Sequence, residues 1–249
     1  MFIGIPLKSK KVSSDWSRVT ELFNNTLRSV FNQIDPNFKV FVACHEIPET
    51  PYGDDPRLEF LPVDFAPPRW RVERNVDRYR KREVIASRVR QEGGGYIMLL
   101  DADDLVSNRL VKFVHDDQAP YGYVVQKGWE LNYERRKISR APAFHRLCGS
   151  CAIINWDEED LPRFPSAPES CRFRDFIDNN NHPAWASASA SQGRPLQSLP
   201  FRGVIYVWNN GENFSVAKGN VGARRRLLRF LMPSNRLSAK IIEEFALQV

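Results

Sequence analysis

A short apolar segment with sharply defined ends constrains the fold of this chain most. Residues 96–100 read Tyr-Ile-Met-Leu-Leu, with glycines at 93–95 before them and Asp101, Asp103 and Asp104 after them. An apolar run without alternation is typical of a strand that is buried on both faces in a parallel sheet. Carboxylates just beyond the carboxyl end of such a strand lie where open α/β sheets bind ligands. The segment therefore predicts a parallel sheet with a polar site at its edge.

The elements that precede this strand follow the order of an α/β sheet. Apolar residues recur at helical spacing after Ser14 or Asp15, either of which is a suitable N-cap. Strand, helix and strand in succession predict an α/β fold with a mostly parallel central sheet flanked by helices. The predicted elements are strands at 2–7, 38–44, 58–63 and 96–100, helices at 16–31 and 79–91, and a loop at 66–77.

The second half of the chain has weaker patterns. Pro183 suits a first helical turn and Gly193 suits a C-cap, so we expect a short helix between them. The remaining predictions are a helix at 110–115, strands at 122–125, 144–154 and 204–208, an acidic Pro-rich loop at 157–168, and a turn at 209–211.

Charge and cysteine usage limit the classes of function. The net charge is +6, and the excess is concentrated at 67–92 and 218–249. Such regions suit phosphate-bearing ligands, an anionic membrane face or nucleic acid, and charge alone does not choose among them. No run approaches the roughly 18 apolar residues of a membrane span, and no leader is apparent, so we expect a cytoplasmic protein. We expect Cys148 and Cys151, despite their redox spacing, to be packing or loop thiols.

The segment from Arg82 to Asp104 resembles the central signature of GT-A-fold glycosyltransferases of the family-two type. The shared features are a basic helix closed by glycines, a Gly-x-Tyr-Ile strand start and an Asp-x-Asp-Asp end. The resemblance implies a GT-A, Rossmann-like fold in one domain at 1–215. Its halves would be a nucleotide-sugar part at 1–110 and an acceptor part at 111–215, followed by a basic amphipathic tail at 216–249.

The activity implied by this resemblance is metal-dependent sugar transfer. The donor would be a nucleotide diphosphate sugar, UDP-sugar first, and the acceptor a glycan or a lipid-linked molecule, with inversion at the anomeric carbon. No nucleic acid is expected as a partner. Peripheral contact with the inner membrane face is one option for residues 224–232, where Arg224 and its neighbours mix cations with apolar side chains. Closure over the diphosphate, or packing on the domain, is the alternative.

The spacing of the Asp-x-Asp-Asp motif suits a divalent cation. Mn²⁺ or Mg²⁺ held by one or two carboxylates can bridge diphosphate oxygens and act as a Lewis acid. Alternating residues leaving a strand project to one side. We therefore expect Asp103 as the main metal ligand, Asp101 on the metal or the ribose, and Asp104 in support of either. An ordinary polar turn is the alternative interpretation, and the surrounding helix and strands favour the site.

Other site residues follow from the resemblance alone. It places the base and ribose near Pro6 and Lys8, after the first strand, and near His45 and Glu46, after the second. The acidic residue that usually closes the second strand is displaced to Glu46 or replaced by His45. Two further donor-site positions are Arg82, toward the diphosphate, and Ala102, within the acidic motif.

The resemblance also predicts a general base at the start of a helix that ends in glycine. One helix length before Gly193 lies His182, where the family usually has Asp. Imidazole can serve as a base at neutral pH because its ordinary pKa is about 6.5. Asp178 and Asp175 are the carboxylate alternatives. His182 could instead be only a helix-start residue or a metal or phosphate contact. Further on, Asn209 or Asn210 stands where some GT-A enzymes have a metal-binding His.

Three alternative functions make different demands on the sequence. A metal-dependent nucleotidyltransferase normally has a Gly-rich loop after the first strand, and residues 6–14 contain no glycine. A basic nucleic-acid-binding module would interleave aromatic residues with its cations on exposed strands, whereas here the cations cluster in a helix, a loop and the tail. A non-catalytic scaffold derived from a transferase is compatible with the unusual Glu46, His182 and Asn209.

Overall fold

A seven-stranded sheet forms the centre of the protein. The computed structural model describes residues 1–70, 73–165, 169–213 and 235–248. The strand order is β10-β6-β9-β4-β1-β2-β3, and four of the six neighbouring pairs are parallel, which confirms the predicted mostly parallel sheet. The strands are β1 (Phe2–Pro6), β2 (Lys39–Cys44), β3 (Leu58–Pro62), β4 (Gly94–Leu99), β6 (Gly122–Val124), β9 (Ala152–Asp157) and β10 (Gln197–Ser198).

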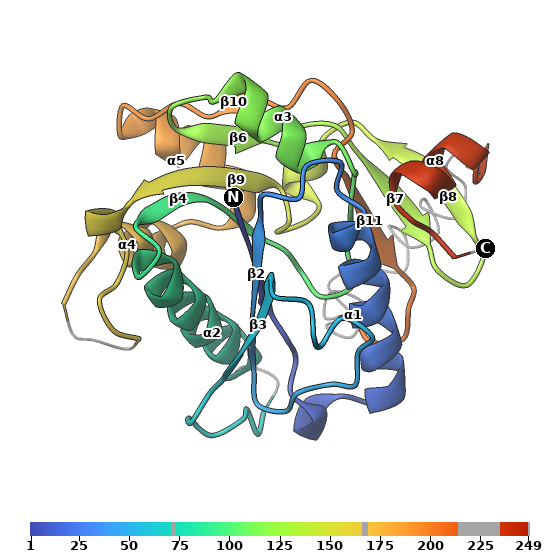
Figure 1. Ribbon diagram of the computed structural model, residues 1–249, viewed down its shortest axis with the longest axis horizontal. Helices are drawn as coiled ribbons and strands as arrows, with labels where there is room; N and C mark the ends of the chain where they lie inside the picture. The colour runs from blue at the N-terminus through green and yellow to red at the C-terminus, as the bar shows by residue number, and fades with distance from the viewer. Residues whose placement is uncertain (71–72, 166–168, 214–234, 249) are drawn as a thin grey trace.

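Two long helices, α1 (Trp16–Phe31) and α2 (Glu73–Arg90), lie on either side of strands β2 and β3 (Figure 1). The side chain of Asp15 accepts a hydrogen bond from the Arg18 amide and so begins α1 as predicted. Helix α2 packs against β1 at Gly4, where a Cβ would come within 2.6 Å of the Ile85 Cγ2. Gly4 therefore lets α2 approach the sheet closely, and this fixes the helix that carries the basic side chains.

A second, five-stranded sheet was not anticipated from the sequence. Its order is β12-β8-β7-β11-β5, and the C-terminal helix α8 lies beside it (Figure 1). Its apolar residues form their own small core with Phe245, which is fully buried. The elements are β5 (Leu105–Val106), β7 (Gly128–Asn132), β8 (Lys137–Ala141), β11 (Val204–Trp208), β12 (Asn235–Arg236) and α8 (Ala239–Glu244).

Several predicted boundaries were wrong. The loop expected at 66–77 ends early, because the Glu73 carboxylate accepts the amides of Arg69 and Trp70 and starts α2 there. The strand expected at 144–154 begins only at Ala152, since residues 144–146 form a 3-10 turn that is bonded to the Gln126 carbonyl. The remaining helices are α3 (Leu110–Asp117), α4 (Arg172–Asn179) and α5 (Trp185–Ser191), with 3-10 turns η1 (Lys10–Val12), η2 (Phe144–Arg146), η3 (Glu158–Asp160) and η4 (His182–Ala184).

Two predictions from the sequence concern the membrane: the absence of a spanning helix and the role of the basic tail. Every helix in the part of the chain that the structure describes is too short or too polar to cross a bilayer. The basic segment Arg224–Met232, and with it the expected membrane or diphosphate contact, lies outside the described residues.

Candidate active site

The acidic motif lies at the carboxyl end of β4, between β1 and β9. The Leu100 amide donates to the Gly4 carbonyl, which continues the sheet, and the Asp101 amide donates to the Ser150 hydroxyl at 2.9 Å. The chain then turns, with the Asp104 amide bonded to the Asp101 carbonyl. In this turn Ala102 packs against the hydrophobic core. The carboxylates of Asp101, Asp103 and Asp104 have different surroundings.

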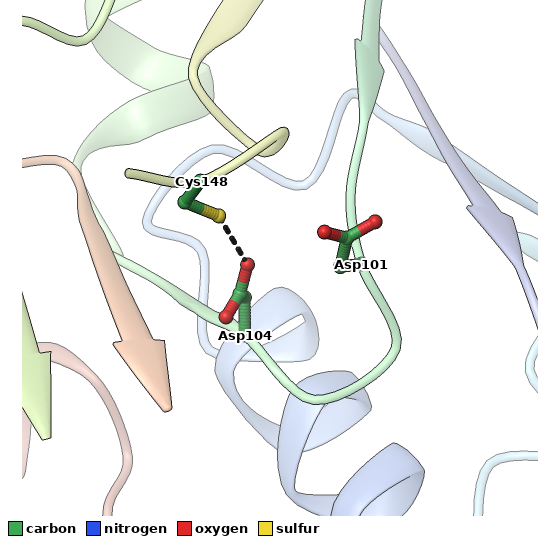
Figure 2. A group of neighbouring side chains, drawn as sticks. All are labelled: Asp101, Asp104 and Cys148. Carbon is green, nitrogen blue, oxygen red and sulfur yellow. Dashed lines mark hydrogen bonds between the residues drawn. The ribbon is translucent and has the colours of Figure 1, made fainter. Parts of the chain in front are cut away.

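The Asp104 carboxylate is fully buried and is held by three donors. One oxygen accepts from the Cys148 thiol at 2.8 Å (Figure 2) and from the Ser150 hydroxyl at 2.7 Å, and the other from the Val207 amide at 3.2 Å. Burial, with the neighbouring charges of Asp103 and Asp101, raises the pKa of Asp104 well above its usual value. Asp104 therefore joins the acidic turn to both sheets.

The Asp103 carboxylate is tied to the loop that follows β11. One of its oxygens accepts from the side-chain amides of Asn210 at 2.8 Å and Asn213 at 2.9 Å. Burial, and next the charge of Asp101, raises the pKa of Asp103 to about 6. Asn210 thus contacts the acidic motif as a hydrogen-bond donor. Asn213 has the same role and was not found from the sequence.

Asp101 differs from Asp103 and Asp104 because, among the described residues, no group donates a hydrogen bond to its carboxylate. It is half-buried, and one of its oxygens lies within 4.8 Å of ligand atoms of Asp104 and Cys148 (Figure 2). Burial and the charge of Asp104 raise the pKa of the Cys148 thiol, which keeps it a hydrogen-bond donor. Of this acidic group, Asp101 is the residue whose carboxylate is available to a ligand.

None of the four cysteines forms a disulfide bond. All four cysteines are free, and Cys148 and Cys151 are both buried, as expected for packing thiols.

A buried guanidinium faces the same space as Asp101. Arg82 on α2 is 4% exposed, and its Nε has no hydrogen-bond partner in the part of the chain that the structure describes. The Asp101 Oδ2 and the Arg82 Nη2 lie 3.5 and 3.7 Å from the point where Gly149 would carry a Cβ, so both flank this glycine. Burial, and next the charge of Arg78, lowers the pKa of Arg82 to about 10, while Asp101 opposes the shift. Arg82 stays charged at neutral pH.

The imidazole of His182 lies within reach of these charges. Its Nδ1 donates to the His145 carbonyl at 2.8 Å, which fixes the neutral ring as the tautomer with an unprotonated Nε2. Burial is the largest cause that lowers the pKa of His182; Arg78 and Arg82 act in the same direction, while the His145 bond and Asp101 oppose it. At neutral pH, His182 therefore carries a free lone pair on Nε2.

The carboxylate alternatives lie on α4. Asp175 accepts from the Ser170 hydroxyl at 2.7 Å. Asp178 is influenced by the charges of Glu83 and Arg174, and burial raises its pKa. Asp175 and Asp178 are both exposed, whereas His182 is half-buried and is the candidate on whose pKa the charge of Asp101 acts.

The residues expected around the base and ribose hold loops together. His45 Nε2 contacts the Asp77 carboxylate at 2.7 Å, and the other Asp77 oxygen accepts from the buried Lys81 at 2.8 Å. Glu46 accepts from the Lys10 amide at 2.9 Å.

The loop after β1 is also fastened to the loop after β11. Lys8 forms an ion pair with Glu212, whose other oxygen accepts the amides of Ser14 and Asp15 at 2.9 and 2.7 Å. Pro6 pairs with Ala43 in the sheet. These contacts shape the edge of the site beside β1 and β2.

We predict that Ser150→Ala destabilises the fold. Ser150 is fully buried, and its hydroxyl both donates to Asp104 and accepts from the Asp101 amide. Its loss leaves two buried polar groups short of a partner, which should lower the free energy of unfolding by about 2 kcal/mol in urea denaturation. Ser191→Ala, at an exposed site on α5, should change it by less than about 0.5 kcal/mol. Equal unfolding midpoints for the two variants would contradict the role given to Ser150.

Comparisons with known proteins include a similarity to a solved structure. No family model and no curated protein matches the chain. The chain is similar to the crystal structure of residues 1–349 of S. aureus TarS, at 9% identity and a TM-score of 0.47. The similarity covers 83% of this chain and 60% of that one, so the chain spans less than two thirds of that structure. A similarity of this degree identifies neither substrate nor activity.

Proposed function

We propose that this protein transfers a sugar from a nucleotide diphosphate sugar to a hydroxyl group of a glycan or lipid-linked acceptor. One observation supports this most: at the carboxyl end of β4 the Asp101 carboxylate and the buried Arg82 guanidinium both flank Gly149, and the charges of both act on the pKa of the His182 imidazole. Together they supply the groups that sugar transfer from a diphosphate needs: a site for a cation, a positive charge for the leaving group, and a base.

The residues fit a divalent cation held mainly by Asp101. Mn²⁺ and Mg²⁺ prefer oxygen ligands and keep several waters when only one or two carboxylates bind them. Asp101 offers a carboxylate without a hydrogen-bond donor among the described residues, and Asp103 is the second candidate ligand because only one of its oxygens is held by the asparagines. When bound, the cation would act as a Lewis acid on the diphosphate.

Arg82 stabilises the leaving diphosphate. As the bond between the anomeric carbon and the phosphate oxygen breaks, negative charge accumulates on the diphosphate. A fixed guanidinium in a buried position stabilises that charge without first having to reorganise. UDP-sugar is the donor proposed first, with sugar and base to be identified by binding.

His182 acts as the general base. Its Nε2 accepts the proton of the acceptor hydroxyl while the acceptor oxygen forms the new bond to the anomeric carbon. The displaced nucleoside diphosphate leaves from the opposite side, so the configuration at that carbon is inverted. The bond from Nδ1 to the His145 carbonyl orients the ring for this role.

Gly149 keeps open the space between Asp101 and Arg82. In Gly149→Ala the added methyl would lie 3.5 Å from the Asp101 Oδ2 and 3.7 Å from the Arg82 Nη2, contacts that the fold accommodates. We expect kcat/KM to fall about tenfold while the melting temperature stays within the error of wild type, because the methyl displaces substrate from its place. Gly53→Ala, at an exposed turn, is the matched control. Unchanged kcat/KM in Gly149→Ala would place the substrate elsewhere.

The activity is tested by donor turnover. The protein is incubated with a panel of UDP-, GDP-, CDP- and dTDP-sugars, Mn²⁺ and a mixture of glycan and lipid-linked acceptors, and release of nucleoside diphosphate is measured. The proposal predicts release from one class of donor that depends on added acceptor. Release that does not depend on acceptor would indicate a hydrolase, and release of pyrophosphate from nucleoside triphosphates would indicate a nucleotidyltransferase.

A further inference from the structure

Three arginines form a continuous stripe on helix α2. Arg74, Arg78 and Arg82 are four residues apart and so lie on one face of the helix, over about 12 Å of its length. We propose that this guanidinium ladder, defined as Arg74, Arg78 and Arg82, binds a diphosphate group without the help of a divalent cation. This inference rests on the proposed function for the identity of the ligand, which is the diphosphate of the donor.

Each of the three arginines of the ladder has a side-chain N–H group without a hydrogen-bond partner among the described residues. The Nε of each is buried and makes no hydrogen bond with the described residues, and Arg82 as a whole is 4% exposed. A buried Nε–H group without a partner is unfavourable, and a bound oxyanion would remove this cost. Arginine is also the side chain best suited to phosphate, because its planar donors can bind two oxygens at once.

The other basic residues of α2 already have partners. Lys81 is bonded to Asp77 and to the Leu7 carbonyl, and Arg88 pairs with Glu59 and Glu92. The guanidinium of Arg80 lies over the Phe65 ring at 3.8 Å. Among the described residues of α2, only the three arginines of the ladder have a buried Nε without a hydrogen-bond partner.

The position of the ladder connects the donor side of the site with the base. Arg74 donates to the Val12 carbonyl at 3.0 Å, in the loop after β1. At the other end Arg82 flanks Gly149 opposite Asp101. The charges of Arg78 and Arg82 also act on His182. A diphosphate on the ladder would lie between the loop that borders the nucleotide and the residue that receives the acceptor proton.

Several carboxylate oxygens of the acidic motif are already hydrogen-bonded, so fewer are left to bind a cation next to the ladder. The Asp104 carboxylate has three donors, and one Asp103 oxygen has two. Of the three carboxylates of the motif, only that of Asp101 accepts no hydrogen bond from the described residues, and the fixed charge of Arg82 beside it weakens the attraction of a second cation. We therefore assign most of the affinity for the diphosphate to the ladder and reserve the cation for the transfer step.

The test is calorimetric titration of the full chain with UDP, GDP, CDP and inorganic pyrophosphate, in EDTA and in Mn²⁺. In EDTA, affinity for the preferred ligand should stay within about threefold of its value in Mn²⁺, and Arg78→Gln should weaken it by about tenfold or more. Arg78 is chosen because it is half-buried, so the variant should fold as judged by circular dichroism. Arg80→Gln, which removes a charge from another face of the same helix, should bind like wild type.

The outcomes separate this inference from the proposed function. Binding only in Mn²⁺, with Arg78→Gln equal to wild type, overturns the ladder and leaves the proposed function standing. Binding of pyrophosphate in EDTA that Arg78→Gln loses, without binding of any nucleotide, supports the ladder and contradicts the proposed function. Absence of binding by pyrophosphate and all three nucleotides in both buffers overturns the two together.

Discussion

Asp101→Asn should lower sugar transfer by about 10²- to 10³-fold while the protein stays folded. The substitution keeps the size of the side chain and removes the charge that would hold a divalent cation beside the leaving diphosphate. Because the carboxylate accepts no hydrogen bond from the described residues, its loss breaks no internal contact that would destabilise the turn. Initial rates of transfer and the melting temperature measure the two effects.

Two controls define the result for Asp101. Asp175→Asn alters a carboxylate on α4 that is bonded to Ser170, and it should leave transfer unchanged. Asp103→Asn changes the residue that the sequence favours as the metal ligand. A larger loss of transfer in Asp103→Asn than in Asp101→Asn would return that role to Asp103. Transfer by Asp101→Asn above about a tenth of the wild-type rate would contradict the site described above.

His182→Gln should lower kcat by about 10²- to 10⁴-fold without changing the affinity for the donor. The amide cannot take up the proton of the acceptor hydroxyl. His182→Asp, which keeps a proton acceptor at this position, should retain more activity than His182→Gln. Donor affinity, measured by titration, should be the same in all three proteins. Equal rates for wild type and His182→Gln would transfer the role to Asp178 or Asp175.

The pH dependence of wild-type transfer gives a second readout for His182. The imidazole is active when neutral, so activity should be lost as pH falls through its pKa. Burial, with the charges of Arg78 and Arg82, lowers that pKa below the ordinary 6.5, so the acidic limb should lie below pH 6.5. In His182→Asp the limb should move further toward acid, because a carboxyl ordinarily titrates near pH 4. An acidic limb that is identical in the two proteins would exclude His182 as the titrating base.

The first half of the fold could be predicted because its signals are local. The unbroken apolar run at 96–100 and the glycines before it identify β4, and the Asp15 cap with its apolar periodicity identifies α1. The second sheet escaped prediction because its strands are short and mix polar with apolar residues, as in β7 and β8. These strands are stabilised by pairing with each other and with β11, which no local pattern records.

In the candidate site, too, some features could be predicted from the sequence and others could not. Asp101 could be named from the acidic motif, and Arg82 and His182 from the resemblance to GT-A glycosyltransferases. The different surroundings of the three carboxylates could not, because they depend on side chains that come from distant parts of the chain. Asp104 meets Cys148 and Ser150, and Asp103 meets Asn210 and Asn213. One signal was present in the sequence: carboxylates adjacent to a buried strand require donors, and Asn213 lies beyond the last long strand.

Calorimetric titration with the sugar nucleotides themselves tests the central claim most directly. Wild-type protein is titrated in Mn²⁺ with UDP-, GDP-, CDP- and dTDP-sugars, beside Arg82→Gln and the matched Arg80→Gln. We predict saturable binding of one nucleotide class at one site per chain, weakened about tenfold or more in Arg82→Gln and unchanged in Arg80→Gln. Absence of binding by every sugar nucleotide, or equal binding by all three proteins, would contradict a nucleotide-sugar site at the carboxyl end of β4.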